Sequence, residues 1–131
     1  MPYAILRFQK RKAGGVAACE RHNERKKEAY KSNPDIDMER SKNNYHLVKP
    51  PRYTYKKEIN RMVAEAGCRT RKDSVMMVET LITASPEFMN SLPPKEQKAY
   101  FTMALDFISE RVGEKNILSA VVHMDERTPH M

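Results

Sequence analysis

The sequence contains little cysteine and no long apolar run. Its 131 residues include two cysteines, Cys19 and Cys68, too few for the disulfide framework of a small secreted domain. No apolar stretch approaches the ~20 residues that a helix needs to cross a bilayer. The first residues, MPYAILRFQKRK, do not show the charged start and long apolar stretch of a signal peptide. We therefore expect neither export nor a membrane segment, and a reducing cytoplasm as the location.

Internal repeats and low-complexity tracts are also missing, and the length suits one domain. Apolar residue types make up 40% of the chain and charged types 31%, which is too apolar for a wholly disordered chain. The formal net charge is +7, and 19 of the 24 lysines and arginines lie in residues 1–72. This balance favours a polyanionic partner, and nucleic acid is the first candidate.

Local patterns predict alternating strands and helices. Thr54 is a suitable N-cap for an amphipathic helix that ends before Gly67, and Pro93-Pro94 opens a second, longer helix. The expected elements are a strand at 3–8, a basic loop at 9–15, a helix at 16–30, an irregular segment at 31–53, a helix at 55–66, a strand at 75–83, a helix at 95–112 and a strand at 117–124. We predict an α+β fold, with a mostly antiparallel sheet and helices on one face.

The last nine residues, HMDERTPHM, carry the clearest chemical pattern. Residues 125–129 are expected to form a turn, so that His130 begins a strand folding back beside His123. Two imidazoles would then converge across a hairpin, with two carboxylates at its turn, and neutral imidazole is the commonest metal ligand in proteins. The pattern predicts a divalent-metal site at His123 and His130. The simpler alternative is a polar surface turn with two incidental histidines.

These residues resemble the metal motif of the Mob/Pre family of plasmid mobilisation relaxases, also called MobV-type. The family motif reads His-x-Asp-Glu-x-x-Pro-His-x-His, and residues 123–131 match it up to the position before the third histidine. Four other segments resemble family motifs in order: QKRKAGG at 9–15, HNER at 22–25, RSKNNYHL at 40–47 and RKD at 71–73. The resemblance implies that residues 1–131 are the N-terminal part of a relaxase domain, HUH-relaxase-like and lacking its C-terminal strands. We expect the chain to be a fragment.

The resemblance also implies a chemistry. Relaxases nick one DNA strand at a plasmid origin of transfer by transesterification, which leaves a protein–DNA link at the 5′ phosphate. The implied cofactor is Mn²⁺ or Mg²⁺ at His123 and His130, and the implied partner is the origin DNA in single-stranded or hairpin form. His22 falls where the family carries its catalytic histidine, and we expect it to be the nucleophile. Tyr45 is the alternative, because many other relaxases use a tyrosine; it could instead stack on a base or pack in its loop.

The remaining candidates are charged side chains. Glu126 could act as the general base or orient the nucleophile. Arg25 follows His22 by three residues and would share its helix face, from where it could bind the scissile phosphate. The further candidate phosphate contacts are Arg71, Lys10, Lys12 and Arg40. For each of these, a solvated charged side chain is the ordinary alternative.

Two other functions fit the same residues. A two-histidine site would bind metal weakly, so the chain could be a non-catalytic DNA-binding fragment or a repressor. A metal-dependent hydrolase of another polyanion is the third reading.

Overall fold

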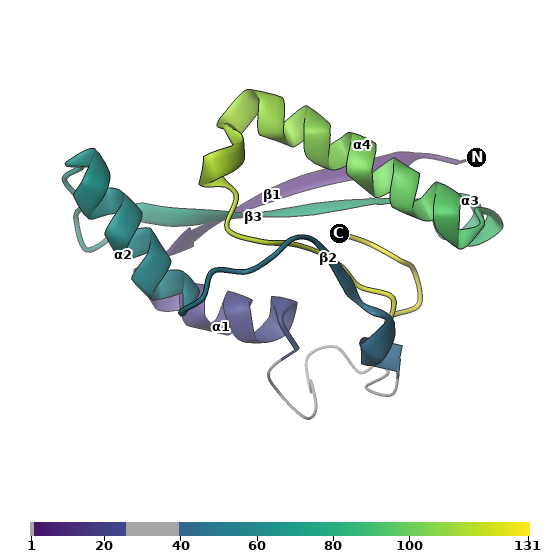
Figure 1. Ribbon diagram of the computed structural model, residues 1–131, viewed down its shortest axis with the longest axis horizontal. Helices are drawn as coiled ribbons and strands as arrows, with labels where there is room; N and C mark the ends of the chain where they lie inside the picture. Colours follow the sequence, from purple (N-terminus) through teal and green to yellow (C-terminus); the bar gives the residue numbers. More distant parts are fainter. Residues whose placement is uncertain (1, 26–39) are drawn as a thin grey trace.

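Two antiparallel strand pairs form the framework of the molecule (Figure 1). The structure is a computed structural model that describes residues 2–25 and 40–131. Strand β1 (Ala4–Lys12) pairs with β3 (Val75–Ala84), and β2 (Tyr45–Val48) pairs with β4 (Ala120–Val122). The predicted α+β class with antiparallel strands is thus confirmed.

The C-terminal residues connect the two strand pairs. Met131 exchanges two backbone hydrogen bonds of 2.8 Å with Ile82 of β3. His130 exchanges backbone hydrogen bonds of 2.8 and 3.4 Å with His123, directly after β4. Residues that exchange both bonds are antiparallel partners. The order across the molecule is therefore β1, β3, the C-terminal tail, β4 and β2, and the hairpin expected at residues 123–130 is present.

Helices cover both faces of this framework rather than the single face that we predicted. Helices α3 (Pro86–Ser91) and α4 (Pro94–Val112) lie on one side of β1 and β3, and α1 (Ala13–Asn23) and α2 (Tyr55–Ala66) lie on the other (Figure 1). Alternation along β3 explains the arrangement. Ile82 is buried with Phe101 of α4, whereas Glu79 points the other way and contacts Cys19 of α1.

Three elements follow their sequence signals closely. Helix α2 begins at Tyr55, and the Thr54 hydroxyl accepts the Lys57 N–H at 3.2 Å. It ends at Gly67, whose φ of 67° suits a residue without a Cβ. Strand β3 and helix α4 match the predicted 75–83 and 95–112.

No helix in the described ranges 2–25 and 40–131 is long and apolar enough to cross a membrane.

The N-terminal strand is longer than predicted, and the loop expected at 9–15 is absent. Pairing with β3 carries β1 to Lys12, supported by an ion pair of 3.5 Å between Arg11 and Glu79. Helix α1 then starts at Ala13 and ends at Asn23, whereas we expected a helix over 16–30, whose last residues lie outside the described ranges. Phe8 of β1 is 60% exposed.

The segment expected to be irregular, 31–53, contains a strand that the sequence did not reveal. Residues 31–39 lie outside the described ranges, a 3-10 turn η1 (Arg40–Asn43) follows, and β2 then pairs with β4. This short strand depends on a partner more than 70 residues away, so it has little local signal. The last strand is also shorter than the predicted 117–124, and a 3-10 turn η2 (Glu114–Asn116) follows α4.

Candidate active site

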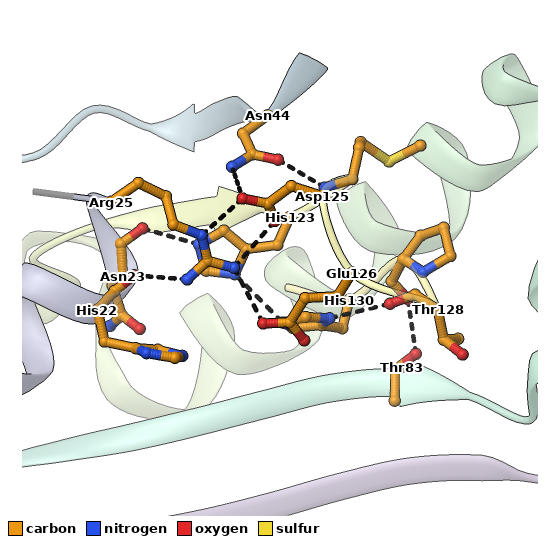
Figure 2. A network of polar contacts seen from close by, with 12 residues as sticks. His22, Asn23, Arg25, Asn44, Thr83, His123, Asp125, Glu126, Thr128 and His130 are labelled. Atoms are coloured by element: carbon orange, nitrogen blue, oxygen red, sulfur yellow. Dashed lines mark hydrogen bonds and ion pairs between the residues drawn. The ribbon is translucent and has the colours of Figure 1, made fainter. Parts of the chain in front are cut away.

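Two imidazoles meet across the C-terminal hairpin (Figure 2). Nδ1 of His123 lies 3.2 Å from Nε2 of His130, and the ring centroids are 5.0 Å apart. His123 is only 4% exposed. Burial lowers its pKa to about 3, and this outweighs the opposing effect of its hydrogen bond to the Asn23 backbone. The His123 ring is therefore neutral at physiological pH.

The outer nitrogens of both rings contact backbone carbonyls, which assigns their tautomers. Nε2 of His123 lies 2.7 Å from the Asn23 carbonyl oxygen, and Nδ1 of His130 lies 3.0 Å from that of Thr128. A carbonyl oxygen only accepts, so each of these nitrogens carries the proton and donates it. The inner nitrogens of the two rings face each other, and a cation shared between them would be bound by the lone pair of each neutral ring.

The geometry of this pair suits adjacent ligands of one metal ion. Two nitrogens bound at about 2.1 Å and about 90° apart are separated by about 3 Å, close to the spacing found here. Glu126 is near the pair, with Oε2 at 3.5 Å from Nε2 of His130. Within residues 2–25 and 40–131, no group of three or more His, Cys, Asp or Glu residues could hold a metal ion. The described part of the chain thus offers an incomplete ligand set, centred on two histidines.

A buried ion pair holds the hairpin turn to the end of α1. Arg25 donates from Nε and Nη2 to the two carboxylate oxygens of Asp125, at 2.7 and 2.9 Å. Nη2 also contacts Oε1 of Glu126 at 3.1 Å, and Nη1 donates to the His22 carbonyl at 2.6 Å (Figure 2). The Arg25 side chain is 6% exposed. Its guanidinium contacts two carboxylates, whereas we expected it to contact the scissile phosphate.

Asp125 is fully buried and accepts from three side chains. Besides Arg25, Ser41 Oγ donates at 2.5 Å and Asn44 Nδ2 at 3.1 Å. Burial alone would raise the pKa of this carboxyl, but the three hydrogen bonds outweigh it and hold the pKa well below its usual range. Asp125 therefore stays ionised and ties η1, α1 and the hairpin together.

His22 points toward this cluster from the last turn of α1 (Figure 2). With His123 and His130 it lines a cavity of about 880 Å³ between β3 and the segment leading into β4. Burial lowers the His22 pKa, Arg25 lowers it further, and Glu126 opposes the shift. The imidazole is half-buried, neutral at pH 7 and open to the cavity.

Tyr45 lies on the opposite face of the strands. It is paired with Val122 in the β2–β4 ladder, and it packs in the cluster that contains Phe101 of α4. Residues directly opposite in an antiparallel pair share a face, and the next residue, His123, points to the other. Burial raises the Tyr45 pKa. The two candidate nucleophiles are therefore separated by the sheet, and His22 shares its side with the histidine pair.

A family model described as "Plasmid recombination enzyme" (Mob_Pre) matches residues 1–131. The chain belongs to this family. A plasmid recombination enzyme of Bacillus thuringiensis is 43% identical over 130 residues, covering 98% of this chain and 29% of the relative. A type 2 enzyme of Staphylococcus aureus (strain N315) is 40% identical over 134 residues, covering 100% of this chain and 32% of that protein. The chain thus spans about a third of the length of these Mob_Pre relatives.

Solved Mob_Pre structures share the fold. The MobM relaxase domain bound to a 22-nucleotide oriT DNA of plasmid pMV158 with a 3′ thiophosphate, Mn-bound, superposes with a TM-score of 0.90 at 39% identity. A second Mn-bound MobM complex with 22-nucleotide oriT DNA gives a TM-score of 0.87 at 38% identity. Each match covers 98% of this chain and 67% of the MobM chain. The Mob/Pre resemblance and the relaxase-like fold are confirmed.

The predicted basic residues of this Mob_Pre chain fall at different distances from the histidine pair. Lys10 is exposed and lines the large cavity. Lys12 lies opposite Val75, and Arg71 lies in the turn just before β3. Both are thus about 20 Å or more along β3 from Ile82, at the end remote from the histidines. Arg40 is exposed in η1, beside the Ser41 that contacts Asp125.

Two side chains that support the C-terminal hairpin were not predicted from the sequence. Asn44 bridges the hairpin, donating to Asp125 and accepting the Met124 N–H at 2.7 Å. Thr83 of β3 donates its hydroxyl to the Pro129 carbonyl at 2.7 Å. Asn44 lies in the RSKNNYHL segment that resembles a family motif, directly before Tyr45. Nothing local marks Thr83, because its partner is set by the docking of the tail.

Proposed function

We propose that this chain is part of a relaxase that cuts one strand of DNA at a plasmid origin by transesterification, with His22 as the nucleophile. The observation that carries the proposal is the position of His22 in the cavity lined by the converging His123 and His130 rings. The related MobM domains are bound to oriT DNA and are Mn-bound, which supports origin DNA as partner and Mn²⁺ as metal. A cytoplasmic location belongs to the same proposal.

In this mechanism the His22 ring nitrogen attacks the scissile phosphorus, and the bond from phosphorus to the 3′ oxygen breaks. The product is a phosphoramidate on the 5′ phosphate, and the ring N–H proton ends on the departing 3′ oxygen. Glu126, whose charge acts on the His22 ring, is the candidate to carry that proton. Nδ1 of His123 and Nε2 of His130 would hold the divalent ion. When bound, the ion would polarise the scissile phosphate and make its phosphorus more susceptible to attack by His22.

Arg25 and Asp125 would act through position rather than by touching DNA. Their ion pair fixes the end of α1, and with it His22, against the hairpin that carries the metal-binding nitrogens. Alignment of nucleophile and electrophile to within an ångström is a large part of such catalysis. In this proposal exposed cations make the phosphate contacts: Lys10 lines the cavity, Arg40 lies beside Ser41, and Lys12 and Arg71 lie farther out.

The test is adduct formation on a labelled single strand of pMV158 oriT DNA with Mn²⁺. We expect the unaltered chain to form a covalent adduct, and Tyr45→Phe to retain it because only a hydroxyl is removed. His22→Ala should form none while still binding the strand. A phosphoramidate is labile in acid, whereas a phosphotyrosine tolerates it. An acid-stable adduct that persists in His22→Ala and disappears in Tyr45→Phe would transfer the role to Tyr45.

A non-catalytic DNA-binding role is the second candidate, and one observation favours it. The described residues supply two histidines to the ion rather than a complete ligand set. Binding of the strand by the unaltered chain, with no adduct and no nicking at saturating Mn²⁺, would support this alternative.

A further inference from the structure

A second cavity lies at the junction between β2 and α2, away from the histidine pair. Its volume is about 490 Å³. Its wall consists of Glu20, Glu24, the loop 50–54 and Lys57. The Asn23 carbonyl, which accepts from His123, directly precedes Glu24 in the chain. The cavity is therefore next to the end of α1 that also carries the proposed nucleophile.

The edge of this cavity carries an exposed aromatic ring with cations set back from it. Tyr53 is 62% exposed. The Arg52 Cζ atom is 5.8 Å and the Lys57 Nζ atom 5.4 Å from the centre of its ring. Among the described residues, Phe107 is also exposed and has a cation beside it, but there the Arg111 Cζ atom lies 3.5 Å from the ring centre. The Tyr53 ring is thus largely exposed, with two long, flexible cationic side chains near it that a planar group can displace, whereas the Phe107 ring is already covered by Arg111.

The wall of the cavity is acidic, in contrast to its rim. Glu24 has a side chain 7% exposed, and its carboxylate accepts from Ser119 Oγ at 2.9 Å and contacts Nε2 of His46 at 2.7 Å. Glu20 is 5% exposed and accepts the Tyr55 N–H at 2.6 Å. Two carboxylates repel a phosphate, so an anionic group would stay at the rim with Arg52 and Lys57. An uncharged planar group with hydrogen-bond donors suits the interior.

We infer that Tyr53 is a base-stacking platform for single-stranded DNA. One nucleobase stacks on its ring at the mouth of the acidic cavity, and the flanking phosphates contact Arg52 and Lys57. Aromatic rings stack on any base, while nearby cations follow the backbone, which is how many proteins hold single strands. This inference rests on the proposed function, since it assigns a binding point to the strand whose cleavage His22 would perform.

Binding measurements provide the first test. The probe is a fluorescein-labelled, mixed-sequence single strand of about 20 nucleotides at low salt, a length that exceeds one binding site. We expect Tyr53→Ala to weaken binding about tenfold, within the range known for loss of one stacked base. Tyr53→Phe should bind as the unaltered chain does. Phe107→Ala, the matched control, should also leave the affinity unchanged.

Fluorescence provides a second test that does not depend on affinity. The chain contains no tryptophan, so Tyr53→Trp and Phe107→Trp each introduce a single reporter. We expect the strand to quench Tyr53→Trp emission, saturating with binding, and to leave Phe107→Trp emission nearly constant. An abasic oligomer of the same length should bind without quenching.

The outcomes separate this inference from the proposal on which it rests. Failure of the unaltered chain to bind any single strand at low salt would contradict both. Strong binding with equal affinity in Tyr53→Ala, together with unquenched Tyr53→Trp, would overturn the stacking role of Tyr53 alone.

Discussion

The Arg25 guanidinium and the Asp125 carboxylate form a bidentate ion pair across 100 residues of sequence, with hydrogen bonds of 2.7 and 2.9 Å. Both side chains are almost completely excluded from solvent. A buried pair of this kind contributes little over an apolar pair of the same shape, but loss of one partner leaves the other charge buried and unpaired.

We therefore predict that Asp125→Ala lowers the free energy of unfolding by about 3–5 kcal/mol. Urea unfolding followed by circular dichroism measures the change. Asp106→Ala, at an exposed position of α4, should change stability by less than about 0.5 kcal/mol. Comparable small effects of the two substitutions would show that the pair does not secure the hairpin.

The pH dependence of stability follows from the same carboxyl. Its pKa is lower in the folded than in the unfolded chain, so its stabilising contribution is complete above the unfolded value of about 4 and decreases as the pH falls below it. We expect the unfolding free energy to decline between about pH 4 and 2, and to decline less steeply in Asp125→Asn. Identical slopes in both proteins would contradict this assignment.

Metal binding should depend on one histidine pair and on no other. We predict that His130→Ala weakens Mn²⁺ binding at least about tenfold, because one of two nitrogen ligands is lost. The decrease of the free Mn²⁺ signal in electron paramagnetic resonance measures this directly. His46→Ala is the control, since His46 pairs with Glu24 away from the hairpin. Equal Mn²⁺ affinity in the unaltered chain and His130→Ala would exclude the pair as ligands.

The two cysteines should differ sharply in reactivity. Burial raises the pKa of the Cys19 thiol to about 12, and its hydrogen bond to Glu79 acts in the same direction, whereas Cys68 is exposed. A thiol reacts through its thiolate. At pH 8 we expect one thiol to react rapidly with Ellman's reagent and the second only on unfolding. Cys68→Ser should abolish the rapid phase; its survival in that variant would place the accessible thiol at Cys19.

DNA affinity should fall steeply with salt, because phosphate contacts release bound counterions. Lys10→Ala should weaken binding to DNA of any base sequence, and it should reduce the slope of log affinity against log salt concentration by about 1. Lys115→Ala, at an exposed site in η2, should leave the slope unchanged. Fluorescence anisotropy at several salt concentrations measures both. An affinity insensitive to salt would rule out the basic half of the chain as the docking surface.

The sequence was informative where structure depends on neighbours in the chain. Helix α2 has its cap and its terminal glycine within the segment itself, and β3 and α4 have strong apolar patterns. Strand β2 has four residues and pairs with β4, which is distant in the sequence. No local pattern therefore predicted it. The faces covered by helices also depended on packing, since both alternate rows of β3 contact a helix.

The candidate site also contains features that the sequence predicts and features that depend on the folded structure. The spacing of His123 and His130 around a turn was sufficient to predict their approach. The partner of Arg25 was not predictable. The sequence around a charged residue near a helix end does not distinguish a contact with phosphate from a contact with a buried carboxylate. The side occupied by Tyr45 required the register of β2 against β4, which is a property of the folded sheet.

The His123 ring has one further consequence, which arises from its two nitrogens. One nitrogen faces the proposed ion, and the other holds the Asn23 carbonyl, one residue after His22. The ring therefore acts as a spacer of fixed length between the segment that carries the proposed nucleophile and the proposed ion. Because this contact is short and His123 is buried, the relative position of the end of α1 and the strand end after β4 is set by a single ring rather than by the length of the intervening chain.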